Sequence, residues 1–252
     1  MLAVLILLPP SEGKSSPVAG SPVDLQALSN PELGAARQRV GDALVKVSGQ
    51  RNALAVLGAG RSLAGDVERN IRLWHAPTDT AARVYSGVLY DAAGMSTWDD
   101  AALSRAADRV RIFSALWGAV SPADRIPAYR LSAGATLGRL GSVTAFWRSR
   151  LGPALDAAAR GHLVVDCRSS GYAAMWAAPT DRTVAVRIER ELDGRRSVVS
   201  HNAKHWRGLL TAHLLAQHRD PETPQELAAL ASGMPGVTAV ELKPGTLTLV
   251  TS

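Results

Sequence analysis

Residues 2–8, LAVLILL, form an uninterrupted apolar run that is followed at once by PPSEGKS at residues 9–15. A short apolar run bounded by turn residues is typical of a strand that is buried on both faces of a sheet. No basic segment precedes the run and no A-x-A-like cleavage motif follows it, so we interpret it as a strand rather than a secretory signal. The chain therefore passes from a buried strand directly into a polar segment that carries Lys14.

The segment Gly13-Lys14-Ser15 contains only part of a phosphate-binding P-loop. That motif needs a glycine, four residues and then Gly-Lys-Ser/Thr, so that successive backbone N–H groups surround the phosphates. No glycine stands upstream of Gly13 at that spacing. The sequence thus disfavours a Walker-type nucleotide site and leaves Lys14 as a candidate functional lysine at the end of a strand.

The charge balance narrows the class of partner. The 252 residues include 28 Lys and Arg against 22 Asp and Glu, which gives a formal net charge of +6. Basic chains attract polyanions through counterion release, so DNA or a phosphorylated small molecule is the expected partner. The alternative is that the many arginines reflect the base composition of the genome and not a binding patch.

Cysteine content and hydropathy indicate where in the cell the protein is expected. The chain has one cysteine, Cys167, which excludes an internal disulfide and indicates a reducing cytoplasm. The N-terminal apolar run is too short to span a bilayer. We therefore expect a cytoplasmic protein without membrane contact, and a monomer.

Periodicity and capping signals predict an α+β fold. Helices are expected to begin at Asn30, with Arg37 on the solvent side, at Pro77, at Thr97 and at Thr223, and to cover 143–160 and 202–218. Valine-rich segments predict strands at 162–167, 183–189, 197–200, 237–242 and 246–250, with Asp193-Gly194 as a hairpin turn. Regular βαβ alternation is missing, so we expect one compact domain over 1–252, with a mixed β-sheet core wrapped by helices, rather than a Rossmann fold.

Residues 114–124, SALWGAVSPAD, have the pattern of a helix-hairpin-helix. We expect the helix from Thr97 to end at Trp117, Gly118 to make the turn, and Ser121-Pro122 to begin the next helix. Backbone N–H groups of such a hairpin bind DNA phosphates without reading bases. An ordinary turn between two helices, capped by glycine, is the alternative.

Tyr129 and Arg130 stand side by side in an irregular segment between Pro127 and Gly134. An arginine held in this way suits bidentate binding of a phosphate or carboxylate. The structural alternative is an ion pair between Arg130 and an acid such as Asp124.

The strand predicted at 162–167 ends in Asp166 and Cys167 and leads into a loop that contains Ser169. Binding sites favour loops at the carboxyl ends of strands. Ser169 is therefore a candidate for an anion or nucleobase pocket. The sequence identifies no partner base for Cys167, so we expect a buried structural cysteine.

Lys204 and Arg207 are three residues apart and share one face of the helix predicted over 202–218. His201 and His205 are one turn apart, as paired metal ligands are, but no acid or third histidine stands at matching spacing. We therefore expect this helix to bind an anion, and we expect no metal and no cofactor.

Seven short motifs follow one another along nearly the whole chain. They are Pro10-Ser11-Glu12-Gly13-Lys14, Tyr85-Ser86-Gly87-Val88-Leu89-Tyr90, Leu116-Trp117-Gly118 with Pro122 and Asp124, Tyr129-Arg130-Leu131, Phe146-Trp147, the loop 166–172, and Ser200 with Ala203-Lys204 and Arg207-Gly208. In this order they resemble the YaaA family of peroxide-stress proteins. The resemblance implies a mixed fold with a positively charged cleft, a helix-hairpin-helix at 114–124, DNA binding, and protection from peroxide that comes partly from limiting free iron.

Three functional hypotheses follow. In the first, the protein binds DNA without sequence specificity, and its anion-binding residues are Ser11, Lys14, Gly118, Tyr129, Arg130, Ser169, Lys204 and Arg207. In the second, it is an enzyme that acts on a nucleotide, nucleobase or other anionic small molecule in the same basic cleft, with Lys14 as the catalytic residue and Glu12 or Asp166 as a general acid or base. In the third, it is a structural or interaction protein whose six tryptophans are packing anchors.

Overall fold

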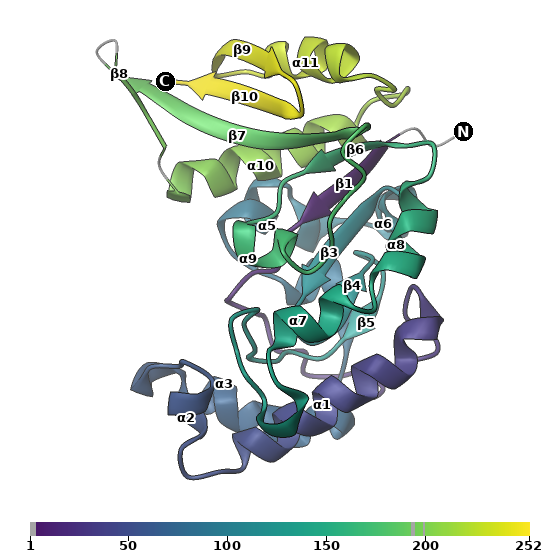
Figure 1. The fold of residues 1–252 in the computed structure, drawn as a ribbon, viewed down its shortest axis with the longest axis vertical. Coiled ribbons are helices and arrows are strands. Elements are labelled where there is room, and N and C mark those ends of the chain that lie inside the picture. The colour runs from purple at the N-terminus through teal and green to yellow at the C-terminus, as the bar shows by residue number, and fades with distance from the viewer. Residues whose placement is uncertain (1–3, 193–194, 199) are drawn as a thin grey trace.

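The computed structural model describes residues 4–192, 195–198 and 200–252 (Figure 1). The strands in these ranges are β1 (Val4–Leu8), β2 (Asp79–Thr80), β3 (Val110–Ser114), β4 (Gly118–Val120), β5 (Arg125–Ile126), β6 (Leu163–Asp166), β7 (Thr183–Leu192), β8 (Arg195–Ser197), β9 (Val237–Lys243) and β10 (Thr246–Thr251). One sheet has the order β4-β3-β1-β6-β7-β10-β9, with β8 paired to β7, and β2 and β5 form a separate small sheet. The central strands β3, β1, β6, β7 and β10 are parallel, whereas β4 and β9 at the edges are antiparallel to their neighbours.

Helices surround this sheet. They are α1 (Gly34–Ser48), α2 (Ala53–Val56), α3 (Ala64–Arg69), α4 (Ala81–Val84), α5 (Val88–Ala92), α6 (Asp100–Ala107), α7 (Val143–Arg148), α8 (Gly152–Ala159), α9 (Ser170–Ala173), α10 (Ser200–Leu215) and α11 (Pro224–Ser232), with 3-10 turns η1 (Pro31–Leu33), η2 (Arg61–Leu63), η3 (Asn70–His75), η4 (Met95–Thr97) and η5 (Gly138–Leu140). Figure 1 shows α11 with β9 and β10 at one end of the molecule and α1 to α3 at the other. Within the described ranges, no helix combines the length and the apolar character that crossing a membrane requires.

The apolar run that opens the chain is the central strand, as its sequence predicts. Every residue of β1 is buried, and the strand pairs in parallel with β3 on one side and β6 on the other. A strand enclosed on both faces and both edges needs apolar side chains throughout. The chain proceeds from β1 to β3 on one side and later to β6 on the other, and such a switch in strand order leaves a crevice at the carboxyl ends of the strands.

Helix α10 packs against both β7 and α5. Gly208 permits the close approach, because a Cβ at this position would lie 2.1 Å from the carbonyl oxygen of Leu89. The contact fixes α10, and with it Lys204 and Arg207, relative to the segment that precedes α5.

The helix-hairpin-helix prediction for 114–124 is wrong. These residues complete β3, make a turn and form β4, in an antiparallel hairpin where Ser114 pairs with Gly118. The Ser114 Oγ accepts hydrogen bonds from the backbone N–H groups of Leu116 and Trp117, and Gly118 has φ 76°, so the segment reverses within a few residues. The apolar spacing that favoured a helix up to Trp117 is uninformative here, because residues 109–122 are all buried, even Arg109 and Arg111. No solvent-facing position is left to mark the period of a helix or a strand.

The predictions of fold class and helix capping are confirmed in part. The mixed sheet wrapped by helices is confirmed, but the class is mixed α/β with a mostly parallel sheet rather than α+β. Thr223 caps α11 as predicted, with its hydroxyl accepting the N–H of Glu226, whereas Asn30 makes no side-chain cap. The predicted turn at Asp193-Gly194 lies outside the described residues.

The prediction that Arg37 faces solvent is also wrong. Its side chain is fully buried and donates to the carbonyl oxygens of Trp117 and Ala119 in the β3–β4 turn and to those of Ser29 and Asn30. Arg37 thus attaches α1 to the edge of the sheet.

Candidate functional site

A cavity of about 390 Å³ opens where β1 and β6 end. Its lining comes from the segment after β1, the start of α5, the loop before α9, and one face of α10. The lining residues are Pro9, Pro10, Ser11, Glu12, Gly13, Ser86, Gly87, Val88, Leu89, Tyr90, Ser169, Tyr172, Lys204 and Arg207. The crevice expected from the strand order is therefore a real cavity with several polar groups in its wall.

The segment after β1 is held in place by α5 and the residues before it. The Tyr90 hydroxyl donates to the carbonyl oxygen of Pro9 over 2.8 Å, and the backbone N–H of Ser86 donates to Ser11 Oγ over 3.1 Å. The backbone of Lys14 forms a β-bridge with Tyr85. These contacts determine the direction in which the Lys14 side chain leaves the segment.

The Lys14 ammonium lies between aromatic rings. Its Nζ is 4.3 Å from the centre of the Tyr129 ring and 5.4 Å from that of Tyr85. The only hydrogen bond it makes in the described part of the chain goes to the carbonyl oxygen of Ser11, over 2.8 Å. Ring faces attract a cation, but they replace its lost hydration only in part.

This environment changes the acidity of Lys14. Burial disfavours the charged form and lowers the pKa of Lys14 to about 7, with Glu12 opposing the shift and Arg130 adding to it. A substantial fraction of Lys14 is consequently a neutral amine at pH 7, which the same side chain in water is not.

A chain of hydroxyl groups runs beneath the lysine. Tyr85 Oη lies 2.9 Å from Tyr129 Oη, which lies 2.7 Å from Ser114 Oγ. Because Ser114 Oγ already accepts two backbone N–H groups, it donates to Tyr129, which in turn donates to Tyr85. Burial raises the pKa of Tyr85 to about 12 and that of Tyr129 well above its usual value, so both hydroxyls stay protonated.

Arg130 reaches the cavity through Glu12. Its guanidinium contacts the Glu12 carboxylate over 2.9 Å and the Glu12 carbonyl oxygen over 3.3 Å. The backbone of Arg130 exchanges two hydrogen bonds with the side-chain amide of Asn70. Asp124, the partner considered from the sequence, instead accepts hydrogen bonds from Ser29 and from the backbone of Ser121.

Two cations on α10 retain free donor groups. Arg207 donates from Nη2 to the carbonyl oxygen of Val186 over 3.0 Å, but its buried Nε has no acceptor among the described residues. Lys204 is exposed and makes no hydrogen bond or ion pair within the described ranges. Both side chains line the cavity, so they can bind an anion there.

Asp166 and Cys167, at the end of β6, have structural roles. Both carboxylate oxygens of Asp166 accept hydrogen bonds from Arg168, at 2.9 and 2.7 Å. Burial raises the pKa of the Cys167 thiol to about 12, opposed by Arg207, so the thiolate is scarcely populated at neutral pH. Cys167 is the buried cysteine that the sequence predicts.

The structure brings most of the sequence-predicted residues together. Ser11, Ser169, Lys204 and Arg207 line one cavity, and Lys14 with Tyr129 adjoins it through the Ser11 carbonyl. Gly118 is elsewhere: a Cβ on it would lie 2.8 Å from the Trp147 ring, so its role is packing in the β3–β4 hairpin.

Sequence reasoning did not select Tyr85, Ser86 or Tyr172 as site residues. Tyr85 supports the lysine, and Ser86 and Tyr172 line the cavity. The available signal was the segment 85–90, which was recognised as a family motif but not assigned a role. Among the described residues, no cluster of three or more His, Cys, Asp or Glu could hold a metal ion.

Fold and site together define a mixed α/β protein with a basic cavity at the strand-order switch of a mostly parallel sheet. Residues 4–233 match the family described as peroxide stress protein YaaA, and the chain belongs to that family. It is 42% identical to the UPF0246 protein SCO2297 of Streptomyces coelicolor over 229 residues, which cover 89% of this chain and 87% of that protein. It is also 42% identical to the UPF0246 protein CE1889 of Corynebacterium efficiens over 253 residues, covering 98% of this chain and all of that protein. The resemblance found in the seven motifs is confirmed.

Proposed function

We propose that this member of the peroxide-stress family is an enzyme that acts on an anionic, nucleotide-like small molecule, with Lys14 as its catalytic residue. The observation that carries the proposal is the position of the Lys14 amine: half-buried between two tyrosine rings, with a pKa near neutrality, beside a cavity that contains unpaired cationic donors. Buried lysines of this kind are suited to accept a proton at neutral pH.

The cavity favours a small molecule over a polymer. Its volume of about 390 Å³ lies within the range of small-ligand sites. Pro9, Pro10, Val88 and Leu89 give it an apolar wall, while Lys204 and Arg207 give it positive charge. An apolar wall beside cations suits a ligand with a flat ring and an anionic group.

The remaining groups have separable roles. Arg207 and Lys204 bind the anionic group, Ser169 offers its hydroxyl to a polar edge of the ring, and Lys14 removes a proton from the bound molecule. The Ser11 hydroxyl donates to the Gly13 carbonyl oxygen and accepts the N–H of Ser86, so it shapes this wall of the cavity. Glu12 brings a carboxylate to the same wall, where its pairing with Arg130 orients it. The hydroxyl chain through Tyr129 fixes the rings that enclose the amine.

DNA binding that limits iron-dependent damage is the second candidate. The net charge of +6 favours DNA binding, and the family is described by its part in peroxide stress. In this alternative, Lys14, Lys204 and Arg207 contact DNA phosphates, and affinity falls steeply with salt. The β3–β4 hairpin takes no part.

A substrate panel tests the enzyme proposal. Nucleobases, nucleosides and nucleoside monophosphates are incubated with the protein at pH 8, and products are identified by mass spectrometry. We expect at least one compound to be converted and Lys14→Met to lower its turnover by about 100-fold or more, which is the usual contribution of a general base. Lys46→Met, an exposed lysine on α1, is the matched control and should retain full turnover.

Two results would contradict the enzyme proposal. One is unchanged turnover in Lys14→Met. The other is no conversion of any compound together with micromolar binding of duplex DNA that weakens steeply between low and moderate salt and is lost in Lys204→Met/Arg207→Met. The second result would establish the DNA candidate instead.

A further inference from the structure

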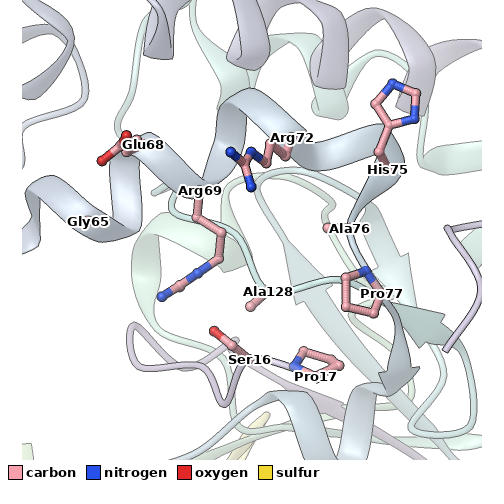
Figure 2. A pocket seen from close by; sticks show the side chains of 10 residues that line it. All are labelled: Ser16, Pro17, Gly65, Glu68, Arg69, Arg72, His75, Ala76, Pro77 and Ala128. Carbon is pink, nitrogen blue, oxygen red and sulfur yellow. The ribbon is translucent and has the colours of Figure 1, made fainter. Parts of the chain in front are cut away.

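A second cavity, of about 520 Å³, lies on the other side of the segment that carries Lys14 (Figure 2). Residues 11–13 of this segment line the first cavity, whereas Ser16 and Pro17 line the second. The other lining residues come from α3, η3 and the segments that follow them: Gly65, Glu68, Arg69, Arg72, His75, Ala76, Pro77 and Ala128. Neither the sequence patterns nor the proposed function uses this cavity.

Two arginines and a histidine, Arg69, Arg72 and His75, line this cavity. Arg69 ends α3, and Arg72 and His75 follow in η3, whose backbone departs from helical geometry at Arg72 (φ −98°, ψ 16°). Figure 2 shows Arg69 and Arg72 extending from this stretch, with Ser16 and Pro17 across the cavity from them. The end of α3 and the first residues of η3 therefore each contribute an arginine to the lining.

The opposite side of η3 is anchored. Asn70 and Leu73 are fully buried, and the Asn70 amide donates to the carbonyl oxygen of Arg130 over 2.9 Å and to Ser48 Oγ over 3.1 Å. The backbone that carries Arg72 is thus fixed before any ligand arrives, which lowers the entropy cost of binding.

The charges in this cavity are incompletely compensated. Arg69 pairs with Asp66 over 3.1 Å, but Arg72 and His75 make no hydrogen bond or ion pair within the described ranges. Glu68 is the one acid in the lining, and Figure 2 shows its carboxylate directed away from Arg72. The cavity is therefore lined by two arginines, of which Arg72 has no partner within the described ranges, and guanidinium groups bind phosphate oxygens through paired N–H donors.

We propose that this cavity binds a phosphate monoester, with its phosphate held by Arg69, Arg72 and the Ser16 hydroxyl and a compact apolar group against Pro17 and Pro77. The site is separate from the Lys14 cavity and does not depend on the chemistry proposed there. The apolar part of the lining distinguishes an ester from free phosphate, since only the ester can cover it.

Backbone NMR of the full chain tests the proposal. Inorganic phosphate and phenyl phosphate are titrated at constant ionic strength against chloride, and the amide signals of Gly65 and Ala76 are followed. We expect saturable shifts at both amides and tighter binding of phenyl phosphate than of inorganic phosphate. If the two amides show no saturable shifts, the proposed phosphate site is wrong. If phenyl phosphate and inorganic phosphate bind with equal affinity, the proposed contact with the apolar group is wrong.

Charge variants make the test specific. Arg72→Met should weaken binding by about tenfold or more, because a charge-assisted hydrogen bond contributes about 1.4 kcal/mol or more. Glu68→Gln should tighten binding, since it removes the one negative charge of the lining. Arg160→Met, an exposed arginine after α8, and Lys204→Met in the first cavity should leave it unchanged. Full affinity in Arg72→Met, or equal weakening in Arg160→Met, would show non-specific attraction only.

Discussion

Arg37 and Lys14 are both cations withdrawn from water, but the protein surrounds them differently. Arg37 donates four hydrogen bonds to backbone carbonyl oxygens, from Trp117, Ala119, Ser29 and Asn30. Lys14 donates one, to the carbonyl oxygen of Ser11, and otherwise faces two tyrosine rings. One buried cation has most of its donors satisfied, and the other does not.

The pKa values follow this difference. Burial lowers the pKa of Arg37 to about 10, so its guanidinium remains charged at any physiological pH. Burial lowers the pKa of Lys14 to about 7, where gain and loss of a proton are nearly balanced. Arg37 is therefore a permanent structural charge, whereas Lys14 can both gain and lose a proton near neutral pH.

The largest expected effect is on stability, from Arg37→Met. The substitution leaves buried carbonyl oxygens of the β3–β4 turn without a donor, at about 1–3 kcal/mol for each unsatisfied group. We expect the free energy of unfolding in urea to fall by about 3 kcal/mol or more. A loss below about 0.5 kcal/mol, the size of an ordinary surface change, would show that Arg37 is not the structural cation described here.

Gly208→Ala should have the next largest effect, because the added methyl group would approach the Leu89 carbonyl oxygen to 2.1 Å. Overpacking of this kind costs about 1–3 kcal/mol, and separation of α10 from α5 would also displace Arg207. Gly65→Ala in α3 is the control, since a Cβ there has open space within 4 Å and helix propensity alone favours alanine. Equal unfolding midpoints for the two variants would contradict the packing argument.

Lys14→Met should act on stability in the opposite direction from Arg37→Met, and in a pH-dependent way. The folded-state pKa of Lys14, about 7, lies below its unfolded value, so between these pH values the unfolded state binds more protons and stability rises with pH. At pH 6 the variant should be more stable than the wild type by about 1–2 kcal/mol, a figure reduced for partial solvent exposure. The difference should shrink as pH rises toward 10; a constant difference would show that Lys14 does not titrate as proposed.

We expect the smallest effect from treatment of Cys167 with a thiol reagent or hydrogen peroxide. Its thiol is fully buried with a raised pKa, so a thiol reagent or hydrogen peroxide should leave the native protein unmodified and react with the urea-unfolded chain. Mass spectrometry of both states measures this directly. Rapid oxidation in the native state would connect peroxide to the site through Cys167, which the structure argues against.

The sequence predicts some elements of the fold correctly and others wrongly, and each outcome has a physical reason. The run 2–8 identifies β1 because a strand enclosed on all sides must be apolar throughout. Burial misleads at 109–122, where even Arg109 and Arg111 are buried and no solvent-facing side shows the period of a helix or a strand. Arg37 was assigned to solvent because carbonyl oxygens from distant segments, its actual partners, have no sequence signature.

The candidate site shows the same limit. Lys14, Ser169, Lys204 and Arg207 were identified because they stand at element ends or on one helix face. Tyr85 and the second cavity were not, because their significance depends on packing between segments far apart in the chain. The positions of basic residues are visible in a sequence, but the satisfaction of their donors is not.

The central claim is tested most directly by measuring the pKa of Lys14. NMR titration of ¹³C-labelled lysine side chains follows the ε-carbon shift from pH 5 to 11, with the Lys14 signal assigned by its absence in Lys14→Met. The account predicts a midpoint of about 7 for Lys14. A Lys14 midpoint near about 10.4, the value of a lysine in water, would contradict it.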